Sequence, residues 1–391
     1  MKPSCPYCGH NPVPHHLYWY NESLNLWLTP LRQKLLYNPL ARFFKRHRLD
    51  ESLAEIFLFL GEGLHLIRRQ KDIFKCKVRR AQVLWEEAQR RGIKMEELLL
   101  LGRPFDAYVA AKSGNRIIFS GLPRPAGYFN NRLDLMDDKS WLKKKLAAES
   151  LPVPAGGAVT SFAGALKIFS QISKPAIVKP RSGSRGRHST TFVSTEAELK
   201  KAYKIAKQLC YWVIVEEQLS GPVYRATVVN FELCGVLRGD PPQVIGDGEN
   251  SIAGLIKIKN SKPHPGVKDI ALDRGLEIFL SRQKLSLASV PAENQVVNLS
   301  EKIGVSYGGS SAEDFEICHP ENQRLFVRAA KVLGDPIVGF DFIIPDISQP
   351  WQGQKCGFIE VNSLPFINLH HDPLRGNPRN VAAKVWDMVG F

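Results

Sequence analysis

Hydrophobic positions in the N-terminal third of the chain recur at helical intervals. The segments ESLAEIFLFLGEGLHLIRR (51–69) and KVRRAQVLWEEAQRRG (77–92) place apolar side chains three and four positions apart, which predicts amphipathic helices. Further on, AYVAA (107–111) and RIIFS (116–120) flank the turn-forming residues Lys-Ser-Gly-Asn, which indicates a hairpin. Residues 17–130 are therefore expected to form a mainly helical region with a small hairpin.

From residue 131 onward, segments with the helical period alternate with short apolar segments. Helices are predicted in DDKSWLKKKLAAES (137–150), TEAELKKAYKIAKQL (195–209) and NQRLFVRAAKVLG (322–334). Strands are predicted in KPAIVKP (174–180), YWVIVEEQL (211–219), YRATVVNFELCGVLRG (224–239, two strands), IVGFDFIIPD (337–346) and CGFIEVN (356–362). This order favours an α+β or mixed α/β fold for residues 131–391.

The last two predicted strands each carry an acid in an apolar run. An antiparallel hairpin that turns near Pro350 and Trp351 would set Asp341 opposite Glu360, and the strand period would put Asn362 on the face of Glu360. Two unpaired carboxylates so close together would repel each other, so we expect a cation between them. Hard oxygen ligands of this kind suit Mg²⁺ or Mn²⁺ shared with substrate phosphates.

Candidate phosphate ligands precede these acids. Lys139 opens a predicted helix, Lys179 ends a predicted strand, and the loop PRSGSRGRHST (180–190) follows with glycines, arginines and hydroxyls. Glycines let backbone N–H groups approach phosphate oxygens, and the cations compensate charge. Glu216 and Glu217 end the next strand, where they could contact a nucleoside or lie in solvent as ordinary surface acids.

Composition limits the class of protein. The chain has 391 residues and a formal charge of +15 from 53 basic and 38 acidic residues, which favours a polyanionic partner. No run is long and apolar enough for a membrane span or an export signal. Seven scattered cysteines fit a reducing cytoplasm better than a disulfide framework.

Read in order, these motifs resemble the ATP-grasp superfamily and, within it, the ATP-grasp domain of the cyanophycin synthetases. Lys139, VKPRSGSRGR, VIVEEQLSG, GFDFI and IEVNSLP follow the superfamily order. VIGDGENSIAGLIKIKN, GVSYGGSSAEDFEICHPEN and HHDPLRGNPRNVAAKVWDMV are similar to cyanophycin synthetase signatures. The resemblance covers about residues 130 to 391 and implies two α+β lobes that clamp ATP.

The resemblance also implies roles for individual residues. Residues 183–186 would form a mobile loop over the phosphates, and residues 216–219 would form the adenine hinge. The ATP contacts implied in this way are Lys139, Lys179, Ser182, Gly183, Ser184, Gly186, Glu216, Glu217 and Leu219. Magnesium ligands would be Asp341, Glu360 and Asn362. Arg225 and Arg238 would act near the transferred phosphate and the acyl intermediate. Ser306, Gly308, Gly309, His370 and Arg379 would line the acceptor side.

The activity implied is ATP-dependent ligation of a carboxylate to an amine through an acyl phosphate, on amino-acid or peptide substrates, with a homo-oligomer as one candidate assembly. Several positions depart from the family pattern. Val223 replaces an acid, Ser182 replaces an aspartate, and Gly304 and Tyr307 stand where substrate selectivity is set. The resemblance does not include the Mur-ligase-like domain of cyanophycin synthetase, so this chain alone is not expected to run the two-amino-acid polymer cycle.

The N-terminus CPYCGH, in the Cys/His-rich residues 1–16, has one knuckle of a zinc site. Cys5 and Cys8 would need two more ligands, for which His10, His15, His16 and Cys76 are candidates, or the pair could remain free thiols. A knuckle beside the basic residues 68–91 also suits a module that binds nucleic acid or another acidic polymer and carries a degenerate ATP-grasp domain, although the complete lysine and acid set makes nucleic acid the less favoured partner. An ATP-grasp kinase is the third alternative.

Overall fold

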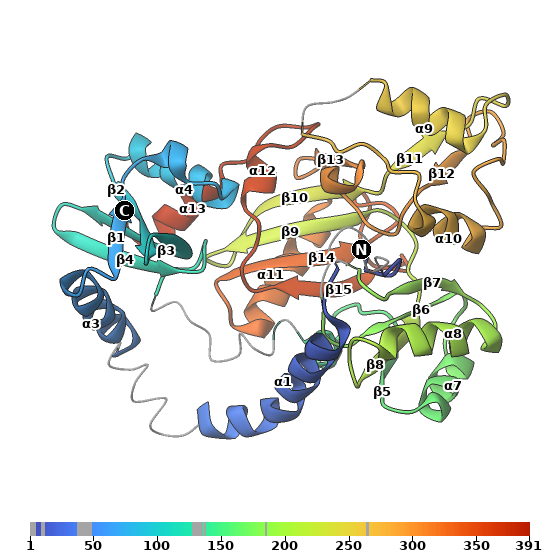
Figure 1. Cartoon of the computed structure of the whole chain (residues 1–391), viewed down its shortest axis with the longest axis horizontal. Coiled ribbons are helices and arrows are strands. Elements are labelled where there is room, and N and C mark those ends of the chain that lie inside the picture. Colours follow the sequence, from blue (N-terminus) through green and yellow to red (C-terminus); the bar gives the residue numbers. More distant parts are fainter. Residues whose placement is uncertain are drawn as a thin grey trace.

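The computed structural model describes residues 5–8, 12–36, 49–126, 136, 138–183, 186–262 and 266–391. These residues form a mixed α/β structure with sheets of four, five, two and four strands, all paired antiparallel. Figure 1 shows the five-stranded sheet in the middle, with the two four-stranded sheets on either side. The expected mixed fold is confirmed for these residues.

The central sheet has the strand order β13-β10-β9-β14-β15. Its strands are β9 (Val223–Val229), β10 (Glu232–Asp240), β13 (Ser310–Glu313), β14 (Ile337–Ile343) and β15 (Gly357–Asn362). One face packs on α6 (Lys139–Ala147) and α11 (Pro320–Leu333) through a core that includes Phe326, Phe340, Phe342 and Phe358. The opposite face therefore remains for polar side chains.

A second sheet, in the order β5-β8-β6-β7, lies below the central sheet in Figure 1. It consists of β5 (Gly156–Val159), β6 (Ala176–Pro180), β7 (Thr190–Val193) and β8 (Val213–Glu217). The helices α7 (Phe162–Gln171) and α8 (Glu196–Lys207) cover it through an aliphatic core. A Thr195–Glu198 capping box explains where α8 begins. Strands β6 and β7 are joined by the predicted phosphate loop.

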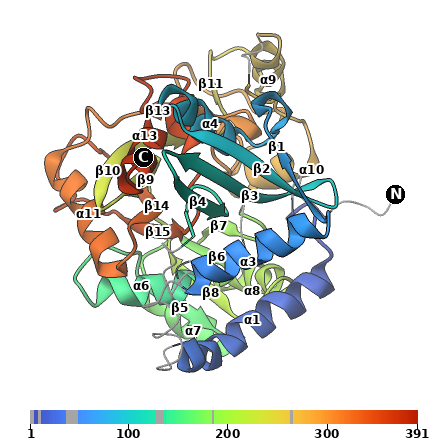
Figure 2. The same ribbon diagram turned by 90° about the vertical axis from the view of Figure 1, so that its left-hand side faces the viewer.

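The N-terminal region contains more strand than the sequence pattern indicated. The expected hairpin is present as β3 (Arg103–Lys112) and β4 (Asn115–Ser120), but β1 (Ile67–Gln70) and β2 (Lys94–Leu100) extend it to a four-stranded sheet. The unbroken leucines at 98–100 conceal the strand period of β2. The helices of this region are α1 (His15–Leu36), α3 (Leu49–Gly63) and α4 (Arg79–Arg90), with a short helix η1 (Ile73–Lys75). Figure 2 shows α1 along the lower side and α3 above it.

This N-terminal sheet shares a core with the C-terminus. The helix α13 (Val381–Met388) packs on α4, and the indole N–H of Trp386 donates to the carbonyl of Leu84 at 3.0 Å. The predicted domain limits at residues 16 and 130 stay predictions, but this apolar core crosses the second of them. The residues on both sides are thus packed as one body.

The remaining elements complete the upper right part of Figure 1. Strands β11 (Gln243–Ile245) and β12 (Val296–Asn298) pair next to α9 (Ile252–Asn260) and α10 (Arg274–Arg282). Two short helices, η2 (Val305–Tyr307) and α12 (Asn368–His371), lie near the ends of β13 and β10. Among the residues described, no helix combines the length and apolar character that a membrane span requires.

Candidate nucleotide and metal site

The hairpin register predicted for the two acids is confirmed. Asp341 on β14 lies directly opposite Glu360 on β15, although a bulge follows between Asp341 and Phe342. Asp341 is also opposite Arg225 on β9, whose guanidinium donates to both carboxylate oxygens at 2.9 and 3.0 Å. Directly opposed residues share a sheet face, so these three side chains form one charged row.

The same sheet face carries Asn362, two residues beyond Glu360 and opposite Gly339. Its amide nitrogen is buried and has no hydrogen-bond partner among the described residues. A buried N–H donor without a partner is costly unless a ligand, such as a phosphate oxygen, accepts from it. The two carboxylates and the oxygen of this amide match the oxygen donors that Mg²⁺ or Mn²⁺ prefers, so the residues fit the predicted ion.

Lys139 connects the loop after β6 to the hairpin of β14 and β15. It is the first residue of α6, which Asp138 caps by accepting from the backbone N–H groups of Ser140 and Trp141. The Lys139 ammonium lies 3.5 Å from a Glu360 oxygen and donates to the carbonyl of Gly183 at 2.7 Å. The lysine predicted to bind phosphate therefore touches both Glu360, a predicted metal ligand, and the predicted phosphate loop.

A second lysine cluster surrounds Glu216, which is 2% exposed on β8. Lys179 on β6 lies 2.6 Å from one Glu216 oxygen, and Lys143, one turn after Lys139 on α6, pairs with the other. Lys143 was not predicted from the sequence, where its only signal is the four-residue spacing from Lys139. The place of Glu216 in the adenine hinge stays a prediction, and in the structure its carboxylate pairs with these two lysines.

Burial changes the proton affinities in this cluster. It lowers the pKa of Lys143 to about 8, against the attraction of Glu216. Burial alone would raise the pKa of Glu216, but Lys143 and Lys179 hold it below its usual value. Two cations thus share one carboxylate, and the excess positive charge suits a polyphosphate.

The other residues of the predicted hinge occupy the expected strand end. The carboxylate of Glu217 accepts from the backbone N–H of Ala155 at 3.1 Å and lies 2.8 Å from the Lys355 ammonium. Leu219 is 7% exposed and follows the strand as a buried apolar residue. Their role as nucleotide contacts stays a prediction.

The phosphate loop is tied to the N-terminal helix. The hydroxyl of Ser182 hydrogen-bonds to Glu22 of α1, and a Cβ at Gly183 would lie 3.3 Å from the Tyr18 hydroxyl. Gly183 and Gly186 both have positive φ, which explains glycine at these two positions. Ser184 lies outside the described residues.

The structure does not bring Arg238 to the charged row. Arg238 on β10 is in register with Tyr224, so it lies on the sheet face opposite that of Arg225. Its guanidinium pairs with Asp240 at 3.1 Å and with Asp314 at 3.7 Å. The sequence analysis placed both arginines at the reaction centre because it could not assign their faces.

The residues predicted for the acceptor side are divided between two places. Ser306 is exposed, and Gly308 and Gly309 are buried in the turn after η2, where a Cβ on Gly309 would lie 2.2 Å from the Asp240 carbonyl oxygen. His370 and Arg379 lie elsewhere. His370 is fully buried, and its two ring nitrogens form hydrogen bonds with Thr227 at 2.7 Å and Glu313 at 2.6 Å. The guanidinium of Arg379 stacks on the ring of Phe315. These contacts make His370 an internal brace of the central sheet.

Cys5 and Cys8 lie together, and the structure adds two imidazoles to them. His15 and His188 complete a group whose four potential ligand atoms are all within 4.8 Å of one another. Of the candidates considered from the sequence, Cys76 is buried in a different core, His16 is exposed, and His10 lies outside the described residues. His188 was missed because it is 180 residues away from Cys8 in the chain.

The sequence is similar to those of several known proteins. No protein-family model matches the chain. Cyanophycin synthetase of Trichormus variabilis is 33% identical over 264 residues, which is 66% of this chain and 29% of that protein. The glutathione biosynthesis bifunctional protein GshAB of Mannheimia succiniciproducens is 31% identical over 328 residues, which is 79% of this chain and 42% of that protein. The chain thus spans less than half the length of these curated relatives.

A solved structure agrees with the sequence relatives. The bifunctional glutathione synthetase from Pasteurella multocida superposes with a TM-score of 0.55 at 28% identity, covering 79% of this chain and 43% of that one. These relatives match the chain to a domain of the ATP-grasp superfamily. Within the superfamily, about two thirds of the chain resembles the ATP-grasp domain of cyanophycin synthetase.

Proposed function

We propose that this protein is an ATP-dependent carboxylate–amine ligase that forms an amide bond and releases ADP and phosphate. The observation that carries the proposal is the contact of Lys139 with both Glu360 and the phosphate loop. It brings the hairpin that would hold the cation next to the loop that would contact the phosphates, which is the arrangement that phosphoryl transfer from a Mg²⁺–nucleotide requires. The relatives named as synthetases support the same class of reaction.

The nucleotide would lie between the lower sheet and the central sheet. Lys139, Lys143 and Lys179 would bind its phosphates, Glu217 and Leu219 its nucleoside, and Asp341, Glu360 and Asn362 would hold Mg²⁺ or Mn²⁺. The ion would supply charge compensation on the phosphate oxygens. Arg225 would orient the carboxylate of Asp341 within the row, because its guanidinium donates to both carboxylate oxygens.

The reaction has two steps. A substrate carboxylate oxygen attacks the γ-phosphorus, the bond from that phosphorus to the β–γ bridging oxygen breaks, and an acyl phosphate and ADP result. An amine then attacks the acyl carbon, phosphate leaves, and the amine loses a proton. The lysines would offset the charge on the transferred group, and Arg225, on the same sheet face as Asp341, would stabilise the oxyanion of the second step. The loop of residues 181–189 would exclude water from the acyl phosphate.

The substrates are proposed to be an amino-acid or peptide carboxylate and an amino-acid amine, with Ser306, Gly308 and Gly309 at the acceptor side. All seven cysteines lie in described parts of the chain and none forms a disulfide, which supports a reducing compartment such as the cytoplasm. Zinc at Cys5 and Cys8 is the second metal ion that we propose. A homo-oligomer remains one candidate assembly.

The deciding experiment is a pairwise screen of amino acids and short peptides for ADP release, with mass spectrometry of the products. A ligase releases ADP only when a carboxylate and an amine are both present. ADP release with phosphorylation of a hydroxyl would instead identify a kinase. Absence of ADP release and of Mg²⁺–ATP binding would favour a binding module.

A further inference from the structure

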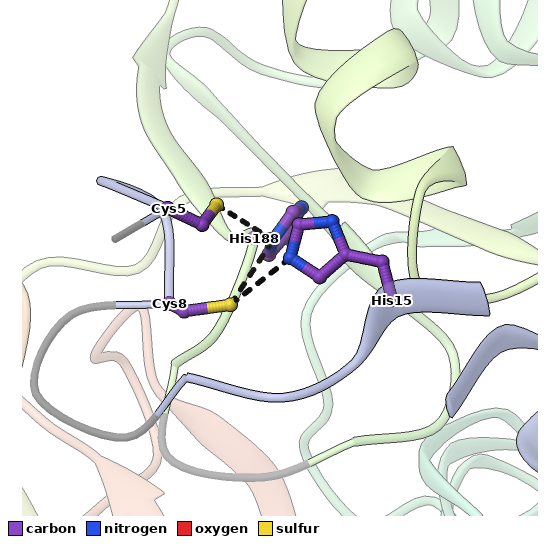
Figure 3. A group of neighbouring side chains, drawn as sticks. All are labelled: Cys5, Cys8, His15 and His188. Atoms are coloured by element: carbon purple, nitrogen blue, oxygen red, sulfur yellow. Dashed lines mark hydrogen bonds between the residues drawn. The ribbon is translucent and has the colours of Figure 1, made fainter. Parts of the chain in front are cut away.

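The N-terminal cysteines form a tight turn against the phosphate loop. The backbone N–H of Cys8 donates to the carbonyl of Cys5 at 3.1 Å, so both sulfur atoms face the same side. Figure 3 shows these sulfurs directed at the imidazoles of His15 and His188. Cys8 is 1% exposed and His188 is not exposed at all. Four side chains of the types that bind metals, two of them fully buried and two partly buried, therefore meet at one place.

His188 is held in the orientation that a metal ligand needs. Its Nδ1 lies 2.8 Å from the carbonyl oxygen of Ile205, which has no proton to give, so Nδ1–H must be the donor. The Nε2 atom then carries a lone pair and points at the sulfurs. A backbone carbonyl that fixes the tautomer in this way is the usual support of a metal-binding histidine.

The distances match a tetrahedral ion. With Zn–S of about 2.3 Å and Zn–N of about 2.0–2.1 Å, tetrahedral angles set each sulfur about 3.6 Å from each nitrogen. His188 Nε2 lies 3.5 Å from both Cys5 Sγ and Cys8 Sγ, and His15 Nε2 lies 3.3 Å from Cys8 Sγ. One lone pair cannot accept well from two thiols at once, whereas one central ion satisfies all four groups.

We infer that Cys5, Cys8, His15 and His188 bind one Zn²⁺, and that this ion fastens the N-terminal segment to the phosphate loop. Both thiols release their protons to solvent on binding, so two thiolates and two neutral imidazoles give a site with no net charge. Such a site tolerates burial. His188 stands at the end of the loop, between Gly186 and β7.

Hydrogen bonds also connect the N-terminal segment to the phosphate loop. The backbone N–H of His188 donates to the carbonyl of Tyr7 at 3.0 Å, and Ser182 hydrogen-bonds to Glu22 at the other end of the loop. Lys139 holds the intervening Gly183 carbonyl. If the proposed function is right, the zinc ion therefore limits the opening of the loop over the nucleotide phosphates.

Metal analysis of the full-length protein, purified without chelators or a metal-affinity tag, tests the site. We expect one zinc per chain, and we expect Co²⁺ exchanged into the protein to show the visible bands of a tetrahedral thiolate site. His15→Gln and Cys8→Ser should each lower zinc retention during dialysis against a weak chelator at least tenfold. His16→Gln is the matched control, because His16 is the exposed neighbour of His15. Equal retention by all variants, or wild-type protein without zinc, would overturn the inference.

Hydrogen exchange tests the connection to the loop. Removal of zinc, or His15→Gln, should speed amide exchange of residues 186–189 while leaving β14 and β15 unchanged. Unchanged exchange at these loop amides in a protein shown to have lost its zinc would refute the connection. Neither measurement uses catalysis, so failure of the ligase proposal would leave both results interpretable. His15 is only partly buried, so its variant retains the fold if Cys8→Ser does not.

Discussion

Lys143 provides the sharpest test of the nucleotide site, because only the structure identifies it. Its side chain is 12% exposed, and its ammonium shares Glu216 with Lys179. Lys143→Met keeps the length and apolar stem of the side chain but removes one cation from the cluster. Glu216 keeps its 2.6 Å partner Lys179, so the carboxylate is not left unpaired and the fold should survive.

The magnitude follows from the contact that ATP would lose. A hydrogen bond to a charged group contributes about 1.5–3 kcal/mol. Loss of about 2 kcal/mol corresponds to a decrease of about 30-fold in kcat/KM for ATP, since each 1.4 kcal/mol is a factor of ten. Thermal unfolding should shift little, because removal of the buried cation also removes its desolvation penalty.

Steady-state ADP release with ATP varied would measure the effect, once the screen has identified a substrate pair. Mg²⁺–ATP titration calorimetry measures the same loss without catalysis. Lys144→Met is the matched control, because Lys144 is the next residue on α6 and is exposed. Equal ATP affinity and kcat/KM in the two variants would refute the role assigned to Lys143.

Three further outcomes are expected. Glu360→Gln should lower ADP formation at least about 100-fold with an unchanged circular dichroism spectrum, because it removes one metal-binding charge at constant volume; near-normal turnover would contradict the metal site. The KM for ATP should rise as the pH increases through about 8, because Lys143 loses its proton there. This rise should be absent in Lys143→Met. A wild-type KM that stays constant from pH 7 to 9 would argue against a charged Lys143. Trp386→Ala should destabilise the protein by about 3–5 kcal/mol in denaturant unfolding, because the indole is fully buried between α13 and α4; a change below about 1 kcal/mol would show that the shared core contributes little.

A rise in pH above about 8 should affect ATP binding and stability in opposite directions. Loss of the Lys143 proton weakens ATP binding but stabilises the folded chain. Its pKa is lower in the folded chain, so between about 8 and the usual value of 10.5 the unfolded chain binds more protons. Stability should therefore rise with pH in this window as far as Lys143 is concerned. The loss of ATP affinity above pH 8 would then reflect the missing charge and not unfolding.

Local pattern was enough to predict much of the C-terminal two thirds of the chain. The register of Asp341 with Glu360 follows from strand period and a short connection, both of which involve only neighbouring residues. The strand that ends near Lys179 and the helix that begins at Lys139 follow from equally local signals. The sequence order of these motifs also resembles that of the ATP-grasp superfamily, and the relatives match the chain to a domain of this superfamily.

Tertiary structure alone decided which of these groups meet and which sheet face they occupy. Glu216 receives lysines from a helix and a neighbouring strand, and Cys8 meets His188 across 180 positions of sequence. Arg225 and Arg238 look alike in the sequence, but strand register sends them to opposite faces. The amino-acid order therefore determined the elements and their periods, since these depend on near neighbours. Long-range packing decided the charge cluster and the four-ligand group, because no local period records which distant segments come into contact.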